Sequence, residues 1–331
     1  MLNNQLTPQP MHTDQRLAIV IPAYKSSFFD ETLRSLASQT CKDFTVYVGD
    51  DASPNDLKII CERWSGMIDL RYHRFEQNLG ATDLVGQWTR CMALSSEPWL
   101  WLFSDDDLLD TECVAAFYTQ LDSNEVKHDL YHFNVDVIDG AGVLIKEASP
   151  FPSVLSAPEF AQRRFTHELS SFAPDYVFSR DTFLAKGGFQ AFPRAWCSDD
   201  ATWIKLAGES GICTIIGPKV KWRLSGQNIS SIHTHDRFEK LEAAIQYLEW
   251  LDQYSKRKDW TGSEFSSQSV LMTGRWWLYA QAEGMRIFFS LAGFWSVTGR
   301  LNKIYGGPLV MDALRIFLQD LRVLRRRLLG H

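Results

Sequence analysis

The N-terminal part of the chain alternates short apolar runs with segments whose apolar residues recur at helical spacing. Continuous or alternating apolar residues predict buried strands at residues 17–21, 44–48, 70–74, 99–103 and 130–135. Between consecutive strands, apolar residues three and four positions apart predict an amphipathic helix. Strand–helix repeats of this length predict a parallel sheet with right-handed crossovers, so the expected fold class is α/β.

Three polar residues predict where helices begin. Ser27, with Asp30 three residues later, fits a capping box. Ser53 is followed by a proline and by acidic Asp56, which fits a second helix start. Asp110 is suited to cap the helix after the fourth strand.

From residue 237 the apolar spacing becomes helical. Leu241, Ile245 and Leu248 follow this spacing, and the last segment, residues 309–329, combines an apolar face with several arginines. We therefore expect three parts: a flexible tail over residues 1–15, an α/β domain over residues 16–235 and a helical extension over residues 236–331.

Composition narrows the possible functions. The 331 residues are 45% apolar and 22% charged, which is the balance of a globular protein. A net charge of −6 argues against nucleic-acid binding, which needs a basic face. The six cysteines include no C-x-x-C pair, so we expect free thiols in a reducing cytosol rather than a zinc ribbon or a disulfide framework.

Hydropathy predicts a cytoplasmic protein. Residues 1–15 lack the charged start and apolar core of a secretory signal. The apolar stretch at residues 287–297 is shorter than the roughly 18 residues that a spanning helix needs.

Residues 286–331 carry eight basic and two acidic residues, so the segment 309–329 is suited to an anionic membrane surface. Packing against the α/β domain or a dimer partner would explain the same pattern.

The loop after the first strand excludes two common nucleotide-binding motifs. It reads Pro22-Ala23-Tyr24-Lys25 and contains no G-x-G-x-x-G, and the chain has no G-x-x-x-x-G-K-[ST] segment. A Rossmann dehydrogenase and a P-loop kinase are therefore disfavoured.

Acidic residues directly follow two predicted strands. Asp50 and Asp51 come after the second strand, and Asp105, Asp106 and Asp107 come after the fourth. Ligands bind beyond the carboxyl ends of parallel strands, so we expect both clusters at one site. Adjacent carboxylates repel each other by about 1–4 kcal/mol per close pair, a cost that Mg²⁺ or Mn²⁺ would offset. A solvated loop in which one aspartate caps the next helix explains the cluster equally well.

Seven short motifs occur in a recognisable order. They are residues 19–25 (IVIPAYK), 38–40 (SQT), 48–53 (VGDDAS), 78–80 (NLG), 102–107 (LFSDDD), 186–189 (KGGF) and 198–201 (SDDA). This order resembles that of family 2 glycosyltransferases of the GT-A fold. The resemblance implies a mostly parallel, Rossmann-like sheet flanked by helices. It also implies a nucleotide-binding half over residues 16–108 and an acceptor half over residues 109–235.

The resemblance assigns the nucleotide-binding residues. Pro22, Ala23 and Tyr24 would form the floor under the base, and Asp51 would accept a hydrogen bond from it. A carboxylate suits the imide N–H of uracil or thymine, because charge-assisted hydrogen bonds are the stronger kind.

The resemblance also assigns the metal and the base. Asp105 and Asp106 correspond to the family's D-x-D-type motif, with Asp105 near the nucleotide and Asp106 as a direct metal ligand. Asp107 is a further candidate ligand, because Ser104 stands where the first acid of the longer motif would be. Asp200 falls at the position of the catalytic base that takes the proton of the acceptor hydroxyl.

Several neighbouring residues keep two interpretations. Asp199 would support the base, although acids also favour a helix N-terminus for its dipole. Ser225 stands where relatives carry a metal-reaching histidine; His233 and His235 could substitute, or form a surface pair. Arg223 would lie near the diphosphate or in an internal ion pair, and Trp196 would stack on a sugar or belong to the core.

The sequence therefore predicts an inverting, metal-dependent glycosyltransferase of the hexosyltransferase type. It would move a sugar from a UDP-sugar to a hydroxyl of a glycan or lipid-linked glycan. The resemblance alone implies the setting, which would be bacterial surface polysaccharide or lipopolysaccharide assembly. A sugar-phosphate nucleotidyltransferase is the alternative enzyme, but it would carry a Gly-rich basic loop where Pro22-Ala23-Tyr24-Lys25 stands. An inactive GT-A scaffold is the alternative without turnover, and the retention of Asp51, Asp106 and Asp200 argues against it.

Overall fold

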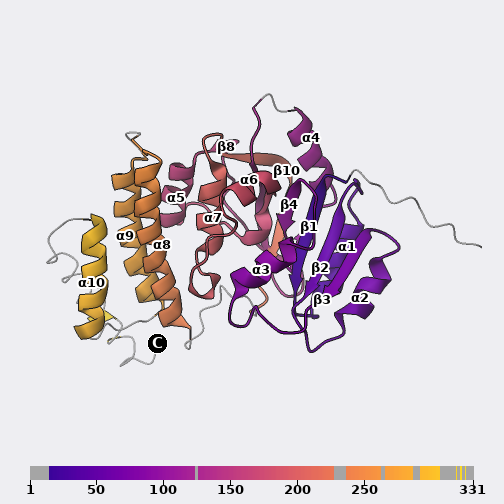
Figure 1. Ribbon diagram of the computed structural model, residues 1–331, viewed down its shortest axis with the longest axis horizontal. Coiled ribbons are helices and arrows are strands. Elements are labelled where there is room, and N and C mark those ends of the chain that lie inside the picture. The colour runs from indigo at the N-terminus through magenta and orange to yellow at the C-terminus, as the bar shows by residue number, and fades with distance from the viewer. Residues whose placement is uncertain are drawn as a thin grey trace, which may run out of the picture.

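The computed structural model describes residues 15–123, 126–226, 236–261, 265–285, 291–305, 318, 321, 322 and 325. Its core is a mixed sheet flanked by helices (Figure 1). The strand order is β3-β2-β1-β4-β9-β6-β10-β5, and in addition β7 pairs with β6 and β8 pairs with β10. The strands are β1 (Leu17–Ala23), β2 (Thr45–Asp50), β3 (Asp69–Arg74), β4 (Trp99–Leu102), β5 (Leu108–Leu109), β6 (Leu130–Ile138), β7 (Leu144–Glu147), β8 (Val154–Leu155), β9 (Tyr176–Ser179) and β10 (Ile212–Arg223).

All five predicted strands are present, and the predicted α/β class is confirmed. Strands β1, β2, β3 and β4 pair in parallel, with Val20 of β1 opposite Tyr47 of β2 and Leu102 of β4. The sequence pattern did not predict β9, which lies between β4 and β6 and is antiparallel to both. The sheet therefore continues beyond its parallel half, and β6 and β10 pair in parallel on the far side of β9.

Alternate residues of β1 face two separate apolar cores. Leu17, Ile19 and Ile21 pack with α1 (Phe29–Ala37), α2 (Leu57–Trp64) and α4 (Cys113–Ser123) on one face of the sheet. Ala18 and Val20 belong to the core on the other face, which includes residues of α3 (Leu84–Met92), α5 (Ala157–Phe165), α6 (Arg180–Ala185) and α7 (Ser198–Ala207). The continuous apolar run of β1 reflects burial on both faces.

Two of the predicted helix caps are wrong. Helix α1 begins after Phe28 and has no side-chain cap, so Ser27 does not form the expected capping box. Helix α2 is capped by Asp56, while the Ser53 hydroxyl donates to the Tyr24 carbonyl at 2.6 Å. Tertiary bonding to the end of β1 therefore takes the side chain that looked like a cap. The Asp110 carboxylate accepts from the backbone N–H of Lys219 at 3.0 Å, so it ties α4's entry loop to β10.

The C-terminal helices α8 (Arg237–Arg257), α9 (Ser267–Gly284) and α10 (Leu291–Tyr305) form a layer beside α5 (Figure 1). Gly274 lets α9 approach closely, because a Cβ there would lie 2.6 Å from Leu248 of α8 and 3.0 Å from Phe165 of α5. On α10, Arg300 forms ion pairs with Glu242 and Glu249 of α8 at 2.7 and 2.6 Å. The predicted helical extension is thus packed on the α/β core through α5.

Two predictions fall largely outside the described residues. The tail over residues 1–15 is described only at residue 15, and the basic segment 309–329 only at residues 318, 321, 322 and 325. Within the described part of the chain, none of the helices combines the length and the hydropathy needed to span a membrane.

Candidate active site

One cavity of about 770 Å³ connects the carboxyl edge of the parallel strands with the C-terminal helices. Five of the acids that line it come from three distant parts of the chain: Asp51, Asp105, Asp106, Asp199 and Asp200. The first three follow β2 and β4, whose carboxyl ends lie at the same edge of the sheet. Pro22, Ala23 and Tyr24 line the same cavity.

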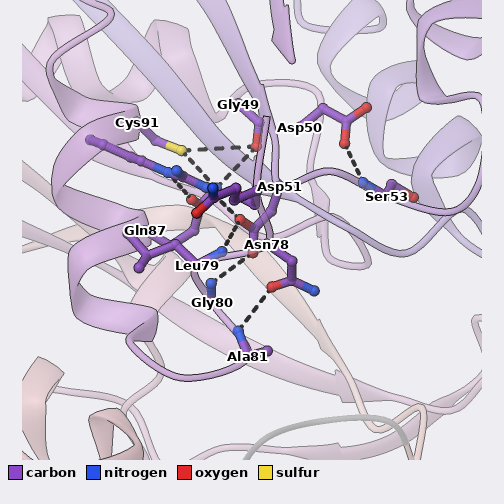
Figure 2. Close-up of polar contacts among 12 residues, drawn as sticks. Gly49, Asp50, Asp51, Ser53, Asn78, Leu79, Gly80, Ala81, Gln87 and Cys91 are labelled. Carbon is purple, nitrogen blue, oxygen red and sulfur yellow. Dashed lines mark hydrogen bonds and ion pairs between the residues drawn. The ribbon is translucent and has the colours of Figure 1, made fainter. Parts of the chain in front are cut away.

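Asp51 is bound by the turn that the NLG motif forms (Figure 2). Its Oδ1 accepts from the Leu79 backbone N–H at 2.8 Å and from Arg90 at 2.6 Å, and its Oδ2 accepts from the Gly80 N–H at 2.8 Å. A Cβ on Gly80 would lie 2.7 Å from Asp51 Oδ2, so the close approach requires glycine. Neighbouring Asp50 is fully buried and accepts instead from Ser53 N–H and Arg74.

Asp105 and Asp106 share a counter-charge that the sequence analysis did not single out. Asp105 Oδ2 accepts from the backbone N–H groups of Tyr24 and Lys25 at 2.9 and 2.7 Å. The Lys25 ammonium lies 3.2 Å from Asp105 Oδ1 and 2.5 Å from Asp106 Oδ2. Burial disfavours the charge on Lys25, but the attraction of the two carboxylates outweighs it and raises the pKa of the ammonium.

The acid cluster offers only part of a metal site. Asp106 lines the cavity, and no hydrogen-bond donor among the residues that the structure describes contacts its Oδ1. Within those residues, no group of three or more His, Cys, Asp or Glu side chains is arranged to hold a metal ion. Asp106 and Asp105 fit a hard cation that takes one or two carboxylates and completes its coordination with phosphate oxygens or water.

Asp107 lies away from the cavity, contrary to its expected role as a ligand. It is fully buried, and its Oδ1 accepts from the Arg223 backbone N–H at 2.7 Å. Burial, with a further contribution from the charge of Asp106, raises the pKa of Asp107 to about 8. A side chain that faces the protein interior cannot reach an ion in the cavity, so Asp107 supports the loop instead.

Arg223 forms the internal ion pair rather than lining the cavity. Its guanidinium is fully buried, pairs with Glu31 at 2.8 Å and donates to the Asp106 carbonyl at 2.8 Å. Two residues later, the Ser225 hydroxyl lies 3.4 Å from Asp106 Oδ2, so the position expected for a histidine does face the acid cluster. His233 and His235 lie outside the described residues.

Asp200 is held by an arginine from α5. Arg164 Nε lies 3.1 Å from each Asp200 carboxylate oxygen, and Nη2 lies 3.0 Å from Oδ2. Burial disfavours the charge on Arg164, but Asp200 outweighs it and raises the pKa of the guanidinium. Sequence reasoning missed Arg164, since an arginine at the end of an amphipathic helix carries no motif.

Asp199 also lines the cavity, and both acids lie in the first turn of α7 as the dipole argument expects. Burial and the nearby charge of Asp200 raise the pKa of Asp199 to about 7. The turn before α7 is strained, because Arg194, Ala195 and Cys197 all have positive φ between 54° and 63°. Such backbone strain in residues that are not glycine is typical of functional sites.

Aromatic residues line the end of the cavity near the C-terminal helices. Trp196, for which sugar stacking and core packing were both open, is half-buried there, and Lys240 lies 5.0 Å from its ring. Tyr247 of α8 and Trp277 of α9 line the same end. Sequence reasoning missed them, because aromatic residues at helical spacing look like core residues.

Comparisons with known proteins match the chain by its sequence and by its fold. A family model described as glycosyl transferase family 2 matches residues 18–188, which is more than half of the chain. Among solved structures, S. aureus TarS 1–349 in complex with UDP-GlcNAc has a TM-score of 0.67 and 15% identity, covering 96% of this chain and 92% of that chain. Another crystal structure of TarS 1–349 gives 0.65 and 14% with the same coverage. At such low identity the likeness shows a shared fold. A search of curated proteins found no match.

Proposed function

The chain belongs to glycosyltransferase family 2, and from this premise we propose that it transfers a sugar from a UDP-sugar to a hydroxyl of a glycan or lipid-linked glycan, with inversion at the anomeric carbon. The observation that carries the proposal is the single cavity lined by Asp51, Asp106 and Asp199. A volume of about 770 Å³ is within the range of sites for ligands of nucleotide-sugar size.

An open hydrogen-bond acceptor position on Asp51 supports uracil as the base. A carboxylate has about four acceptor positions, and the three donors described leave Asp51 Oδ2 with only the Gly80 N–H. Oδ2 can therefore accept one ring N–H, such as the imide N–H of uracil. Guanine presents two adjacent donors, of which Oδ2 could accept only one, and adenine has no ring N–H on its pairing edge. A UDP-GlcNAc complex of TarS, which shares the fold, is consistent with this donor class.

We propose that Asp106, with Asp105, holds Mg²⁺ or Mn²⁺. The cation would offset the charge that develops on the departing diphosphate. Lys25 is already placed to share this task, since its ammonium lies between the two carboxylates and lines the cavity. Arg223 and Asp107 fix the loop from beneath, so that the acids keep their positions when a charged ligand enters.

We assign proton acceptance to Asp199 rather than to Asp200, the residue expected from sequence. Both oxygens of Asp200 accept from Arg164, so its lone pairs are already engaged. Among the described residues no side chain donates to Asp199, and its raised pKa of about 7 suits a general base at neutral pH. Asp200 then acts as a positioning residue, because its negative charge keeps Asp199 basic.

The reaction follows from this arrangement. The acceptor oxygen attacks the anomeric carbon from the face opposite the diphosphate, and its proton passes to Asp199. The bond from the anomeric carbon to the phosphate oxygen breaks as the new glycosidic bond forms, so UDP leaves with the electron pair. One carboxylate suffices, because a diphosphate is already a good leaving group.

We also propose that the enzyme acts in the cytoplasm, at the inner face of a membrane, in assembly of bacterial surface polysaccharide. The support is the excess of six positive charges over residues 286–331 in a chain whose net charge is −6. Deletion of residues 310–331 is then expected to release the protein from anionic vesicles, and unchanged vesicle binding would rule this placement out.

Thermal stabilisation by nucleotides tests the proposed function. UDP with Mn²⁺ is expected to raise the free energy of unfolding by about 2.7 kcal/mol when UDP is at a hundredfold excess over its Kd. GDP or ADP at the same concentration should raise it much less. Asp106→Ala should remove the dependence on Mn²⁺. The matched control is Asp122→Ala, because Asp122 pairs with Arg16 outside the cavity. Stabilisation by GDP alone, or by no nucleotide, would refute the proposed donor.

A further inference from the structure

The C-terminal helices supply one wall of the cavity. Tyr247 of α8 and Trp277 and Gln281 of α9 line it, opposite segments that follow the strands of the sheet. The ring centroids of Phe165 and Trp277 lie 5.2 Å apart, and those of Phe165 and Tyr247 lie 5.7 Å apart. Phe165 directly follows Arg164, the partner of Asp200, so these aromatic residues adjoin the two acids in the first turn of α7.

The basic residues that line this end of the cavity are paired or disfavour a positive charge. Arg164 forms an ion pair with Asp200. Arg194 donates to the Ala81 carbonyl at 3.1 Å and lies 3.4 Å from Glu239. Burial, with a smaller effect of Arg164, lowers the pKa of His167 and so disfavours a positive charge on this imidazole. A phosphate group at this end would therefore find no unpaired cation among the cavity-lining residues that the structure describes.

Two polar atoms at this end of the cavity lack hydrogen-bond partners. The Trp196 indole N–H and the Tyr247 hydroxyl are buried, and neither has a hydrogen-bond partner among the described residues. Buried polar groups in native proteins are nearly always satisfied, so an unpaired one beside a cavity is left for a water or a ligand group to complete. An indole N–H is a donor only, whereas a phenol both donates and accepts, which together match the hydroxyl groups of a sugar.

We propose that Trp196, Tyr247 and Trp277 form an acceptor subsite for an uncharged sugar ring. The aromatic faces would cover the apolar C–H face of the ring, and the two unpaired polar atoms would bind its hydroxyl groups. This inference rests on the proposed function, since it places the acceptor ring beside Asp199. It makes the C-terminal helices, which lie beyond the family match to residues 18–188, a determinant of acceptor choice.

Tyr247→Phe separates this role from a structural one. The tyrosine hydroxyl makes no hydrogen bond with the described residues, so its removal leaves the packing of α5, α8 and α9 intact and is not expected to lower the melting temperature. The same change should weaken binding of a neutral sugar about fivefold to tenfold, the effect of one lost hydrogen bond. Trp276→Phe is the matched control, because Trp276 lies beside Trp277 on α9 but does not line the cavity.

Saturation-transfer NMR on the full chain with UDP and Mn²⁺ tests the proposal. The probes are methyl β-D-glucopyranoside, methyl β-D-galactopyranoside and methyl α-D-mannopyranoside, with sn-glycerol 3-phosphate as the anionic probe. At least one glycoside should receive saturation through its ring protons, more weakly in Tyr247→Phe and Trp277→Leu than in Trp276→Phe. Binding of glycerol 3-phosphate alone, of no probe, or of a glycoside equally well in Tyr247→Phe would overturn the subsite. The UDP signal in the same sample reports on the proposed function separately.

Discussion

Arg164 donates to both carboxylate oxygens of Asp200, and its Nε lies 3.1 Å from each of them. The two residues lie 36 positions apart, on α5 and α7. These hydrogen bonds engage both oxygens of Asp200, so neither is left to accept a proton, and they keep the negative charge of Asp200 next to Asp199. In the proposed mechanism, this pair leaves Asp199 rather than Asp200 to act as the base.

Asparagine substitutions at these two acids should have different effects. Asp199→Asn is expected to lower kcat by about 10²–10⁴, the usual contribution of a general base, without changing the affinity for UDP. Asp200→Asn leaves Arg164 without its buried partner and should cost about 3 kcal/mol of unfolding free energy. Steady-state kinetics, UDP titration and urea unfolding measure the three quantities. The assignment fails if Asp199→Asn turns over normally while Asp200→Asn is inactive.

The activity should depend on pH through Asp199. The base must be deprotonated, so kcat should rise about tenfold per pH unit below a pKa of about 7 and level off above it. Because the charge of Asp200 contributes to this raised pKa, residual activity of Asp200→Asn should level off at a lower pH. The check is the pH profile of kcat at saturating donor for both proteins. A flat profile between pH 5.5 and 8 contradicts the role of Asp199.

Removal of Lys25 should strengthen cation binding. In Lys25→Met the ammonium no longer competes for Asp105 and Asp106, so Mn²⁺ should bind at least about tenfold more tightly in the absence of nucleotide. UDP without metal should bind more weakly, because a positive charge near its phosphates is lost. Calorimetric titration measures both, with Lys221→Met as the control, since Lys221 pairs with Asp110 outside this cavity. Weaker Mn²⁺ binding in Lys25→Met would count against Asp106 as a ligand.

Two glycine substitutions test the nucleotide end of the cavity. In Gly80→Ala the new Cβ would lie 2.7 Å from Asp51 Oδ2, so the turn or the carboxylate must shift and UDP binding should weaken about tenfold. Gly66→Ala is the control, because a Cβ there meets no atom within 4 Å. Fluorescence or calorimetric titration with UDP compares the two. Equal UDP affinity in both variants would show that Asp51 does not contact the base.

The buried His132 should make the fold sensitive to acid. Its ring stacks on Phe151 at 3.7 Å, neither ring nitrogen has a partner among the described residues, and burial lowers the pKa of His132 to about 3. Below pH 6.5 the unfolded chain binds a proton that the folded protein does not. The free energy of unfolding should then fall by about 1.4 kcal/mol per pH unit from this residue.

His132→Phe keeps the stacking and removes the titrating group. It should raise the melting temperature and reduce the loss of stability between pH 6.5 and pH 4, measured by urea unfolding at several pH values. His73→Phe, at an exposed ring that contacts Phe75 edge-on, is the control and should leave the slope unchanged. The same slope in His132→Phe as in the native protein would show that another group causes the acid sensitivity.

The apolar pattern predicted the parallel half of the sheet well, because residues 17–21 and 100–103 are buried and need no distant partner to be recognised as strand residues. It missed β9 (Tyr176–Ser179), since a strand of four residues that runs directly into helix α6 gives too short a pattern. The expected caps at Ser27 and Ser53 were wrong because a capping side chain stabilises a helix by only about 1 kcal/mol, which a tertiary contact can outweigh. The Ser53 hydroxyl, for example, donates to the Tyr24 carbonyl instead.

The sequence by itself determined the fold class, the family resemblance and the meeting of Asp51 with Asp105 and Asp106, because parallel strands bring their carboxyl ends to one edge. The tertiary structure decided what each acid can do. Asp107 turns inward to Arg223, Asp200 is bound by Arg164, and the C-terminal helices bring aromatic residues to the cavity. These outcomes depend on partners far away in the chain, and burial and hydrogen bonding at such contacts follow no local pattern.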